Sequence, residues 1–364
     1  MDNHSFSGSY NKNEVCFLLK PMLLPDTPVH LKEKLIQSGQ RHYSQLLTHE
    51  QPPAVTYSQI FQHALLTNRL RLAVDLFHLA EQIITTRQHP IVLVSLARAG
   101  TPIGVLLKHL LAQHYSINVP HYSISILRDI GIDQQALRYL LQFYAPESLV
   151  FIDGWTGKGS IAKQLTQSLQ AFAVTDDITI APHLYVLADL CGDAAFSATT
   201  DDYLIPSCIL NATVSGLVSR SFYHQEIATS GCFHGCVYYQ HLEPYDASKY
   251  FIDTVSAVFS EAKTQVQTKN RPKLDHTTLQ RISTAFLKDI AWRYGVSQYH
   301  YIKPGIGEAT RVLLRRKARL LLLKDTSHES TQHLRWLAEQ KSVPIQQEQD
   351  LPYQAAALIS EVLP

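Results

Sequence analysis

A polar, glycine-rich segment follows the apolar run 149–152 and carries groups that can bind phosphate. Glycines let the backbone approach a ligand closely, while hydroxyls, backbone N–H groups and an ammonium can donate hydrogen bonds to phosphate oxygens. A carboxylate at the end of the apolar run can accept hydrogen bonds from ribose hydroxyls. The segment predicts an anion site, with a plain strand-to-helix turn as the alternative. Its candidate residues are Asp153, Gly154, Thr156, Gly157, Lys158, Gly159 and Ser160.

Two other turns can bring cations to the same place. Residues 95–102 follow a second apolar run, and Arg98 in this turn can make forked hydrogen bonds to phosphate. A third run ends at Arg128 and Asp129. If the Arg98 turn stood alone, a solvated loop charge would be the simpler interpretation. Ligands of parallel sheets, however, bind where the carboxyl ends of strands converge. The convergence favours function, and the candidates of the first turn are Ala97, Arg98, Ala99 and Gly100.

The segment 231–236 places Cys232 and Cys236 beside His234. Cysteine and histidine can form a nucleophile and its base, or they can ligate zinc. Neighbours this close rarely meet in catalytic geometry, and a zinc site needs four ligands where only three are local. We therefore expect buried cysteines and no metal site here. A cysteine protease with Cys232 as its nucleophile is kept as an alternative.

The elements around these segments alternate between helix and strand. Strands that alternate with helices of ten or more residues predict an α/β fold with a parallel sheet, helices on both faces and right-handed crossovers. This first domain is expected over residues 31–268, after an arm over residues 1–30 that has little function. Helices are expected from residue 68 to before Pro90 and over 102–114, 133–144 and 160–172, with strands over 91–94, 122–127, 149–152 and 184–190.

A second, basic unit is expected over residues 277–364, after a linker over 269–276. Its order of helix, strand, helix, strand and a last helix from Tyr353 predicts a small α/β/α sandwich. Between Lys303 and Lys341 nine basic residues against four acidic ones give +5, so the rest of a chain of net charge +1 carries about −4. Such a patch suits a nucleic-acid backbone, with a solvated helical face as the alternative.

Length and composition place the chain among packed proteins. The 364 residues, 45% of them hydrophobic, suit about two domains. Five scattered cysteines and the lack of a secretion signal predict a reducing cytoplasm. No apolar stretch approaches the roughly 20 residues that cross a bilayer, so no membrane span is expected.

The apolar strand with its acidic residue and Thr-Gly loop resembles the type I phosphoribosyltransferase family over roughly residues 41–255. The sequence more narrowly resembles a bacterial group found with tellurite-resistance operons, some of whose members carry the label cysteine protease StiP. The segments that carry this likeness are 38–44, 95–101, 125–133, 151–160 and 233–235. The resemblance implies a Rossmann-like phosphoribosyltransferase sheet and transfer from phosphoribosyl pyrophosphate with Mg²⁺. Gly154 stands where that family has a second acid.

The same resemblance implies roles for individual residues. Asp153 would contact the ribose hydroxyls, residues 156–160 the 5′-phosphate, and Arg98 with its neighbours the pyrophosphate. Arg128 and Lys158 would stabilise the leaving group. His42, Tyr43 and His234 would line the acceptor pocket.

The order of elements over residues 277–362 resembles the Pelota-type RNA-binding domain. The candidate RNA-binding residues are Gly305, Gly307, Glu308, Arg311, Arg315 and Lys317. Together the two resemblances imply a phosphoribosyltransferase coupled to RNA binding, acting during stress. The alternatives are an RNA-binding regulator that senses a nucleotide without turnover, and the cysteine protease. A homodimer is compatible with each of these three hypotheses.

Overall fold

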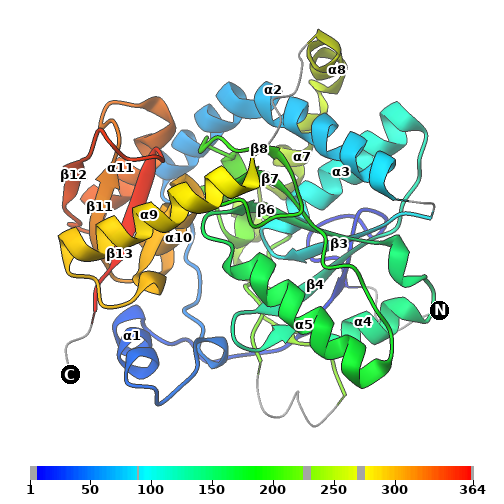
Figure 1. Cartoon of the computed structure of the whole chain (residues 1–364), viewed down its shortest axis with the longest axis horizontal. Coiled ribbons are helices and arrows are strands. Elements are labelled where there is room, and N and C mark those ends of the chain that lie inside the picture. The colour runs from blue at the N-terminus through cyan, green and yellow to red at the C-terminus, as the bar shows by residue number, and fades with distance from the viewer. Residues whose placement is uncertain (1–5, 88–89, 224–230, 269–274, 362–364) are drawn as a thin grey trace.

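The structure is a computed structural model of the chain that describes residues 6–87, 90–223, 231–268 and 275–361. Figure 1 shows a larger unit built around a sheet and, at the left, a smaller unit made of the C-terminal elements. Of the linker expected over 269–276, residues 269–274 lie outside the described residues.

The larger unit is organised around one sheet. Its strands β1, β4, β3, β6, β7 and β8 lie in that order and run parallel, while the short β5 pairs antiparallel with β4. This confirms the predicted α/β fold with a large parallel sheet. The strands are β1 Cys16–Leu18, β3 Val92–Ala97, β4 His121–Leu127, β5 Gly131–Ile132, β6 Leu149–Thr156, β7 Leu184–Asp189 and β8 Phe196–Thr199.

Helices cover both faces of this sheet, which is why its central strands are apolar and buried. The long α2 and α3 belong to the core on one face, and α4 and α5 to the core on the other (Figure 1). No described helix is both long and apolar enough to span a membrane. The helices of this unit are α1 Val29–Gln37, α2 Val55–Thr86, α3 Gly100–Tyr115, α4 Gln134–Leu141, α5 Ser160–Asp176, α7 Ser248–Ser256 and α8 Phe259–Thr268.

The start of the chain, predicted to be an arm, contributes two strands. β1 pairs with β4 at the edge of the large sheet, and Phe17 and Leu18 are buried there. The next strand, β2 Lys20–Pro21, pairs in parallel with β9 Gly235–Cys236. This ladder brings the N-terminal segment next to the cysteine-containing segment 231–236.

The smaller unit is built on a four-stranded sheet in the order β10, β13, β11, β12. The prediction of a last helix from Tyr353 is wrong, because residues 355–359 form β13, antiparallel to both its neighbours. All five residues are buried, and this burial overrides the helix propensity of an alanine-rich run. The elements are α9 His276–Tyr294, β10 Ile302–Pro304, α10 Ile306–Arg315, β11 Ala318–Leu323, α11 Gln332–Gln340, β12 Ile345–Gln347 and β13 Ala355–Ile359.

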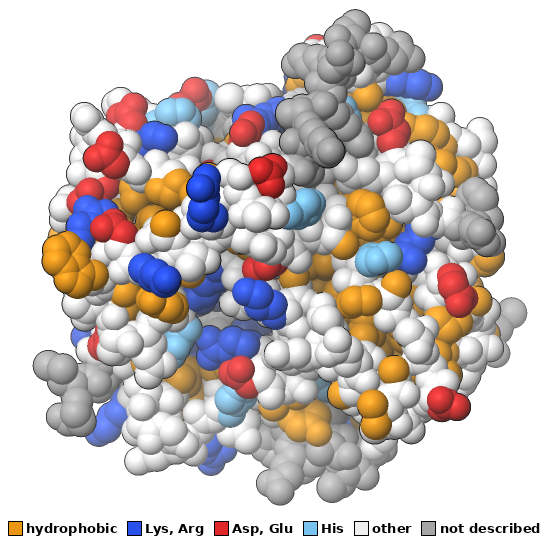
Figure 2. Space-filling model, viewed as in Figure 1, with side chains coloured by type: hydrophobic (Ala, Val, Ile, Leu, Met, Phe, Trp, Pro, Cys, Tyr) orange, Lys and Arg blue, Asp and Glu red, His pale blue; other side chains and the backbone are white. Residues whose placement is uncertain are grey.

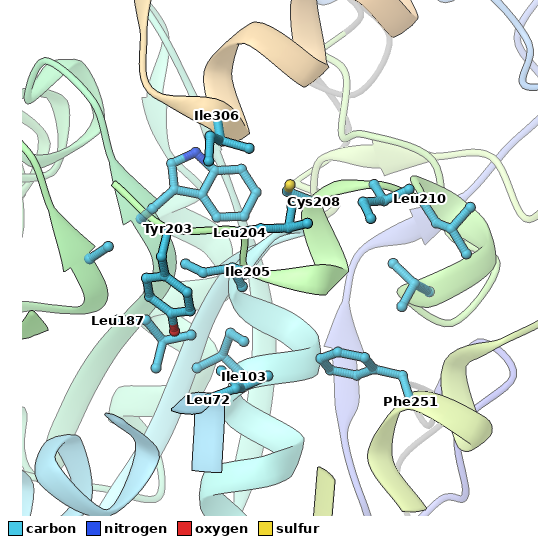
Figure 3. Packing of buried hydrophobic residues seen from close by; sticks show 14 of the residues in the cluster. Leu72, Ile103, Leu187, Tyr203, Leu204, Ile205, Cys208, Leu210, Phe251 and Ile306 are labelled. Carbon is cyan, nitrogen blue, oxygen red and sulfur yellow. The ribbon is translucent and has the colours of Figure 1, made fainter. Parts of the chain in front are cut away.

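The two units share one hydrophobic core. Figure 3 shows Ile306 of α10 close to Cys208 of the larger unit, within the cluster that continues to Leu72. Tyr57 of α2 stacks on Trp336 of α11, with ring centroids 5.1 Å apart. Helix α10 therefore lies against the carboxyl edge of the large sheet, where sequence patterns placed the anion site.

Candidate functional site

The segment around Cys232 is held in place by backbone hydrogen bonds. Lys20 N donates to His234 O at 2.9 Å, and Met22 N donates to Cys236 O at 2.8 Å. These bonds make the ladder between β2 and β9. The ladder fixes Lys20 beside the segment that carries the thiol.

The Cys232 thiol is half-buried, and an exposed lysine contacts it. Lys20 Nζ lies 3.4 Å from Cys232 Sγ. A cation next to a cysteine sulfur favours the thiolate, which is the nucleophilic form. The local sequence pattern predicts Cys232 but not Lys20, because 212 residues separate the two.

His234, predicted to line an acceptor pocket, is buried and anchors the segment. Its Nδ1 lies 2.8 Å from Ser125 Oγ, and its ring packs edge-on against Tyr223. Its backbone N donates to Asp133 Oδ2 at 2.6 Å. Burial lowers the pKa of His234, although the Asp133 charge opposes this. The imidazole is therefore neutral at neutral pH and engaged with Ser125.

His42 and Tyr43, predicted for the same pocket, have different surroundings. His42 Nδ1 lies 2.7 Å from Ser44 Oγ, at the start of a short 3₁₀ helix. The Tyr43 hydroxyl accepts a hydrogen bond from Arg128 N at 2.5 Å, and its ring faces the guanidinium groups of Arg128 and Arg220. Tyr43 thus lies among cations, while His42 caps a turn.

The glycine-rich loop after β6 is covered by the smaller unit. A Cβ on Gly157 would lie 2.7 Å from the carbonyl oxygen of Pro304. Lys158 Nζ donates to two backbone carbonyls of residues 299–302, at 2.7 and 3.2 Å. The predicted leaving-group cation is therefore engaged with main-chain carbonyls between the units.

The strand predicted to end at residue 152 continues to Thr156, so Asp153, Gly154 and Thr156 lie in β6 and not in a loop. Thr156 Oγ1 accepts a hydrogen bond from Gly159 N at 3.0 Å, and Ser160 begins α5. Asp153 Oδ1 accepts one from Gly154 N at 2.8 Å. Burial raises the pKa of Asp153 to about 6, with a nearby guanidinium opposing the shift. The hydroxyl expected to bind a phosphate thus stabilises its own turn.

Arg98 forms hydrogen bonds to other residues of the larger unit. Its guanidinium donates to Glu50 Oε1 at 2.5 Å and to Val218 O at 2.9 Å. Gly100 begins α3 directly after this turn. Ala97, Arg98 and Ala99 line a cavity of about 220 Å³ at the sheet edge, together with Asp153. The structure therefore brings the Arg98 turn and Asp153 together, as predicted.

Most of the predicted RNA-binding residues face the larger unit. A Cβ on Gly307 would overlap the ring of Trp155, and the Arg311 guanidinium lies 4.4 Å from the same ring. Arg311 also bonds to Glu308 at 2.6 Å. Of the six candidates only Lys317 is classed as exposed; the other five are Gly305, Gly307, Glu308, Arg311 and Arg315.

Cys208, at the wall of the cavity that Asp153 lines, is a second thiol with a histidine nearby. Its Sγ lies 3.8 Å from Thr310 Oγ1, which in turn lies 2.8 Å from His333 Nε2. Burial raises the pKa of Cys208 to about 12 and lowers that of His333 to about 3. At neutral pH this is a thiol and a neutral imidazole, and the two are not in direct contact.

The described ranges contain no group of three or more His, Cys, Asp or Glu side chains placed to hold a metal ion. The Mg²⁺ expected with pyrophosphate chemistry therefore has no carboxylate cluster in this part of the chain. It remains an untested prediction.

Comparisons with known proteins point to two families. Residues 8–256 match the family described as tellurite-like stress resistance cysteine protease StiP. Residues 281–361 match the PELOTA RNA binding domain. The chain is 38% identical over 378 residues to the cysteine protease StiP of Acinetobacter baylyi, an alignment that covers 98% of this chain and 95% of that protein.

These matches show that the phosphoribosyltransferase prediction is wrong, because the matching family and relative are both named as cysteine proteases. The prediction relied on the loop 153–160, whose local pattern is typical of a phosphate site. In the folded chain that loop is covered by β10 and α10, and its hydroxyl and ammonium groups are engaged within the protein. Nothing supports phosphoribosyl pyrophosphate as a substrate. The alternative cysteine protease hypothesis is better supported.

Proposed function

Because the chain belongs to the StiP family of tellurite-like stress resistance cysteine proteases, we propose that it is a cysteine protease with Cys232 as its nucleophile. The observation that carries this choice is the 3.4 Å contact between Lys20 Nζ and Cys232 Sγ. The ammonium favours the thiolate, which attacks carbonyl carbon far better than the thiol does. The sulfur also lies in a half-exposed residue, so a polypeptide substrate can reach it.

The four other cysteines are poorer nucleophiles. Burial raises the pKa of Cys16 to about 11 and that of Cys208 to about 12. Burial also raises the pKa of Cys191, to which the Asp189 charge adds, and the pKa of Cys236. Each of these residues is therefore a neutral thiol near pH 7 and is poorly suited to attack a peptide bond.

The pair of Cys232 and Lys20 supplies both groups that acyl transfer needs. The thiolate sulfur bonds to the scissile carbonyl carbon, and the π electron pair moves to the oxygen. When this adduct collapses, the C–N bond breaks and Lys20 donates a proton to the leaving amine. Water then attacks the thioester, its proton passes to Lys20, and the thiolate leaves. In serine-lysine hydrolases, a lysine likewise transfers the protons that histidine transfers in the Ser-His-Asp triad.

Cleavage of casein and of fluorogenic peptides by the full chain tests the proposal. Cys232→Ser is expected to lose roughly 10²-fold or more of the activity, because the nucleophile is removed. Cys208→Ser is the matched control, since it changes a thiol of the same size and should leave activity within about twofold. Equal cleavage by Cys232→Ser and the wild type would overturn the assignment.

We also propose that the C-terminal unit binds RNA, which the PELOTA match over residues 281–361 supports. The face of α10 is covered, so the exposed Lys317 is the predicted contact that remains accessible. Filter binding across a salt series tests this. Lys317→Gln is expected to weaken binding and to reduce the salt slope by about one. A flat salt response of the wild type would contradict phosphate contacts.

A further inference from the structure

A cavity between the two units concentrates positive charge. Its volume is about 530 Å³, within the range of roughly 300–1,000 Å³ typical of small-molecule sites. Figure 2 shows Lys and Arg side chains gathered around a hollow on one face of the molecule. Two carboxylates line the cavity, Glu50 and Glu308. The basic side chains that line it are Lys32, Arg220, Lys303, Arg311, Arg315 and Arg316.

The acidic residues are already paired. Glu50 is bound to Arg98, which lies outside this cavity, and Glu308 is bound to Arg311. Arg316 pairs with Glu33, a buried residue of α1. Lys32, Arg220, Lys303 and Arg315 form no salt bridge with any described carboxylate. We refer to these four as the unpaired cations.

Among the described residues, the hydrogen bonds of Lys32, Arg220 and Arg315 go to neutral groups. Lys32 Nζ donates to Thr48 Oγ1 at 2.8 Å and to a backbone carbonyl at 3.1 Å. Arg220 donates to backbone carbonyls. Arg315 donates to the Asn211 side chain, while its buried Nε has no partner among the described residues. Donor capacity therefore remains around the cavity.

The clustering is unfavourable in the free protein. Burial lowers the pKa of Lys32 to about 8, and the charge of Arg220 adds to the shift. Burial also lowers the pKa values of Lys303 and Arg315. Nearby guanidinium groups lower both further, although the Glu308 charge opposes the shift at Lys303 and the Glu50 charge opposes it at Arg315. Like charges taken out of water destabilise a fold unless something compensates them. An anionic ligand would supply that compensation.

The lining of the cavity also includes aromatic and apolar side chains. Tyr57 and Trp336, which stack on each other, line the cavity together with Pro52, Pro53 and Leu337. Flat aromatic side chains bind nucleobases by stacking without reading their sequence. A lining that combines cations with aromatic rings suits a ligand that carries both phosphate groups and a base.

We propose that this inter-unit cavity binds a nucleoside polyphosphate, with its phosphates on the unpaired cations and its base on the side chains of Tyr57 and Trp336. Lys32 and Arg220 come from the larger unit, whereas Lys303 and Arg315 come from the smaller one. A bound ligand would therefore contact both units. The site does not depend on the proposed protease activity.

Calorimetry and thermal denaturation of the full chain with ATP, GTP and inorganic tripolyphosphate test the proposal. Binding of ATP or GTP at one site per chain, with a rise in Tm, is expected. Inorganic tripolyphosphate should bind at least about tenfold more weakly, because it cannot use the aromatic side chains. Absence of nucleotide binding up to about 1 mM would overturn the site. Equal affinity for tripolyphosphate would overturn the nucleoside part of the proposal.

Matched variants locate the ligand. Lys303→Gln should weaken nucleotide binding about tenfold, because it removes a charge-assisted contact. Lys288→Gln, which changes an exposed lysine of α9, should leave it within about twofold. Arg315→Gln is a second test in case the first variant folds poorly, and circular dichroism checks both. Equal binding by the cavity variants and Lys288→Gln would overturn the assignment.

Discussion

Cys232 and Cys208 lie in two regions that differ in how far they expose a thiol to solvent. Cys232 is half-exposed beside a single ammonium, that of Lys20. Cys208 is only 4% exposed, at the wall of a cavity that Arg98, Arg311 and other cations also line. The Arg311 charge favours its thiolate, yet burial raises its pKa to about 12. At Cys208 desolvation outweighs the nearby charge, so a cation beside a buried thiol does not by itself produce a thiolate.

The two regions also suit different ligands. A protease must admit an extended polypeptide, which the half-exposed Cys232 allows and the buried Cys208 does not. The separate cavity of about 530 Å³ between the units, which Cys208 does not line, can instead hold a small anion through many contacts. The comparison therefore separates a reaction site around Cys232 from a binding site around the unpaired cations.

Opening the buried region should have the largest effect. Trp155 is 8% exposed and packs against Gly307 and Arg311 of the smaller unit. Trp155→Ala is expected to lower the free energy of unfolding by about 3–5 kcal/mol, because it leaves a cavity between the units. Chemical denaturation measures this. Trp292→Ala, at a side chain that is 81% exposed, should change it by no more than about 0.5 kcal/mol. Similar values for the two variants would show that α10 is not docked as described.

Alkylation rates compare the two thiols directly. With iodoacetamide near pH 7.5, Cys232 should react roughly 10²-fold faster than Cys208, because the latter is buried and protonated. Mass spectrometry of the digested protein assigns the modified residue. The difference should vanish in guanidinium chloride. Comparable rates in the folded protein would break the comparison.

Acid should lower the free energy of unfolding through His333, which contacts Thr310 next to Cys208. The pKa of His333 is lowered by burial to about 3, below the usual value of about 6.5. Between these values the unfolded chain binds a proton that the folded chain does not, so stability falls as the pH drops below about 6.5. His333→Gln removes this proton uptake. Between pH 7 and pH 5 the variant should lose about 1–2 kcal/mol less stability than the wild type. Identical pH profiles would contradict a buried neutral imidazole.

Removing the cation beside Cys232 should have the smallest effect. Lys20 is exposed, and exposed charge pairs contribute modestly. Lys20→Met is expected to reduce kcat about tenfold with little change in KM, because the lysine favours the thiolate and transfers protons but does not bind the substrate. Lys12→Met, at an exposed lysine of the same N-terminal segment, is the control. Unchanged kcat in Lys20→Met would remove Lys20 from the mechanism.

Local patterns in the sequence predicted the elements well where burial and periodicity agree. Apolar runs such as 149–152 lie inside strands of the parallel sheet, because both faces of that sheet are covered by helices. The run Ala355–Ile359 was predicted as helix although it is β13. Its alanines favour a helix locally, and only the neighbouring strands β10 and β11 determine its structure.

The site was harder to predict because it depends on contacts between distant residues. The motif around Cys232 drew attention to the thiol, but its partner Lys20 is brought to it only by the ladder of β2 and β9. The loop 153–160 has the composition of a phosphate site, and nothing local shows that Pro304 covers Gly157. Short motifs indicate which chemical groups are present, whereas the burial of these groups in the folded chain determines which of them can react.

The most direct test of the central claim is to trap the acyl-enzyme. The full chain is mixed with a peptide ester, quenched in acid within seconds, digested and analysed by mass spectrometry. The account predicts the substrate's acyl group as a thioester on the fragment that contains Cys232, and its absence from Cys232→Ser. An acyl group on Cys208, or turnover of the ester with no adduct on Cys232, would contradict the assignment of the nucleophile.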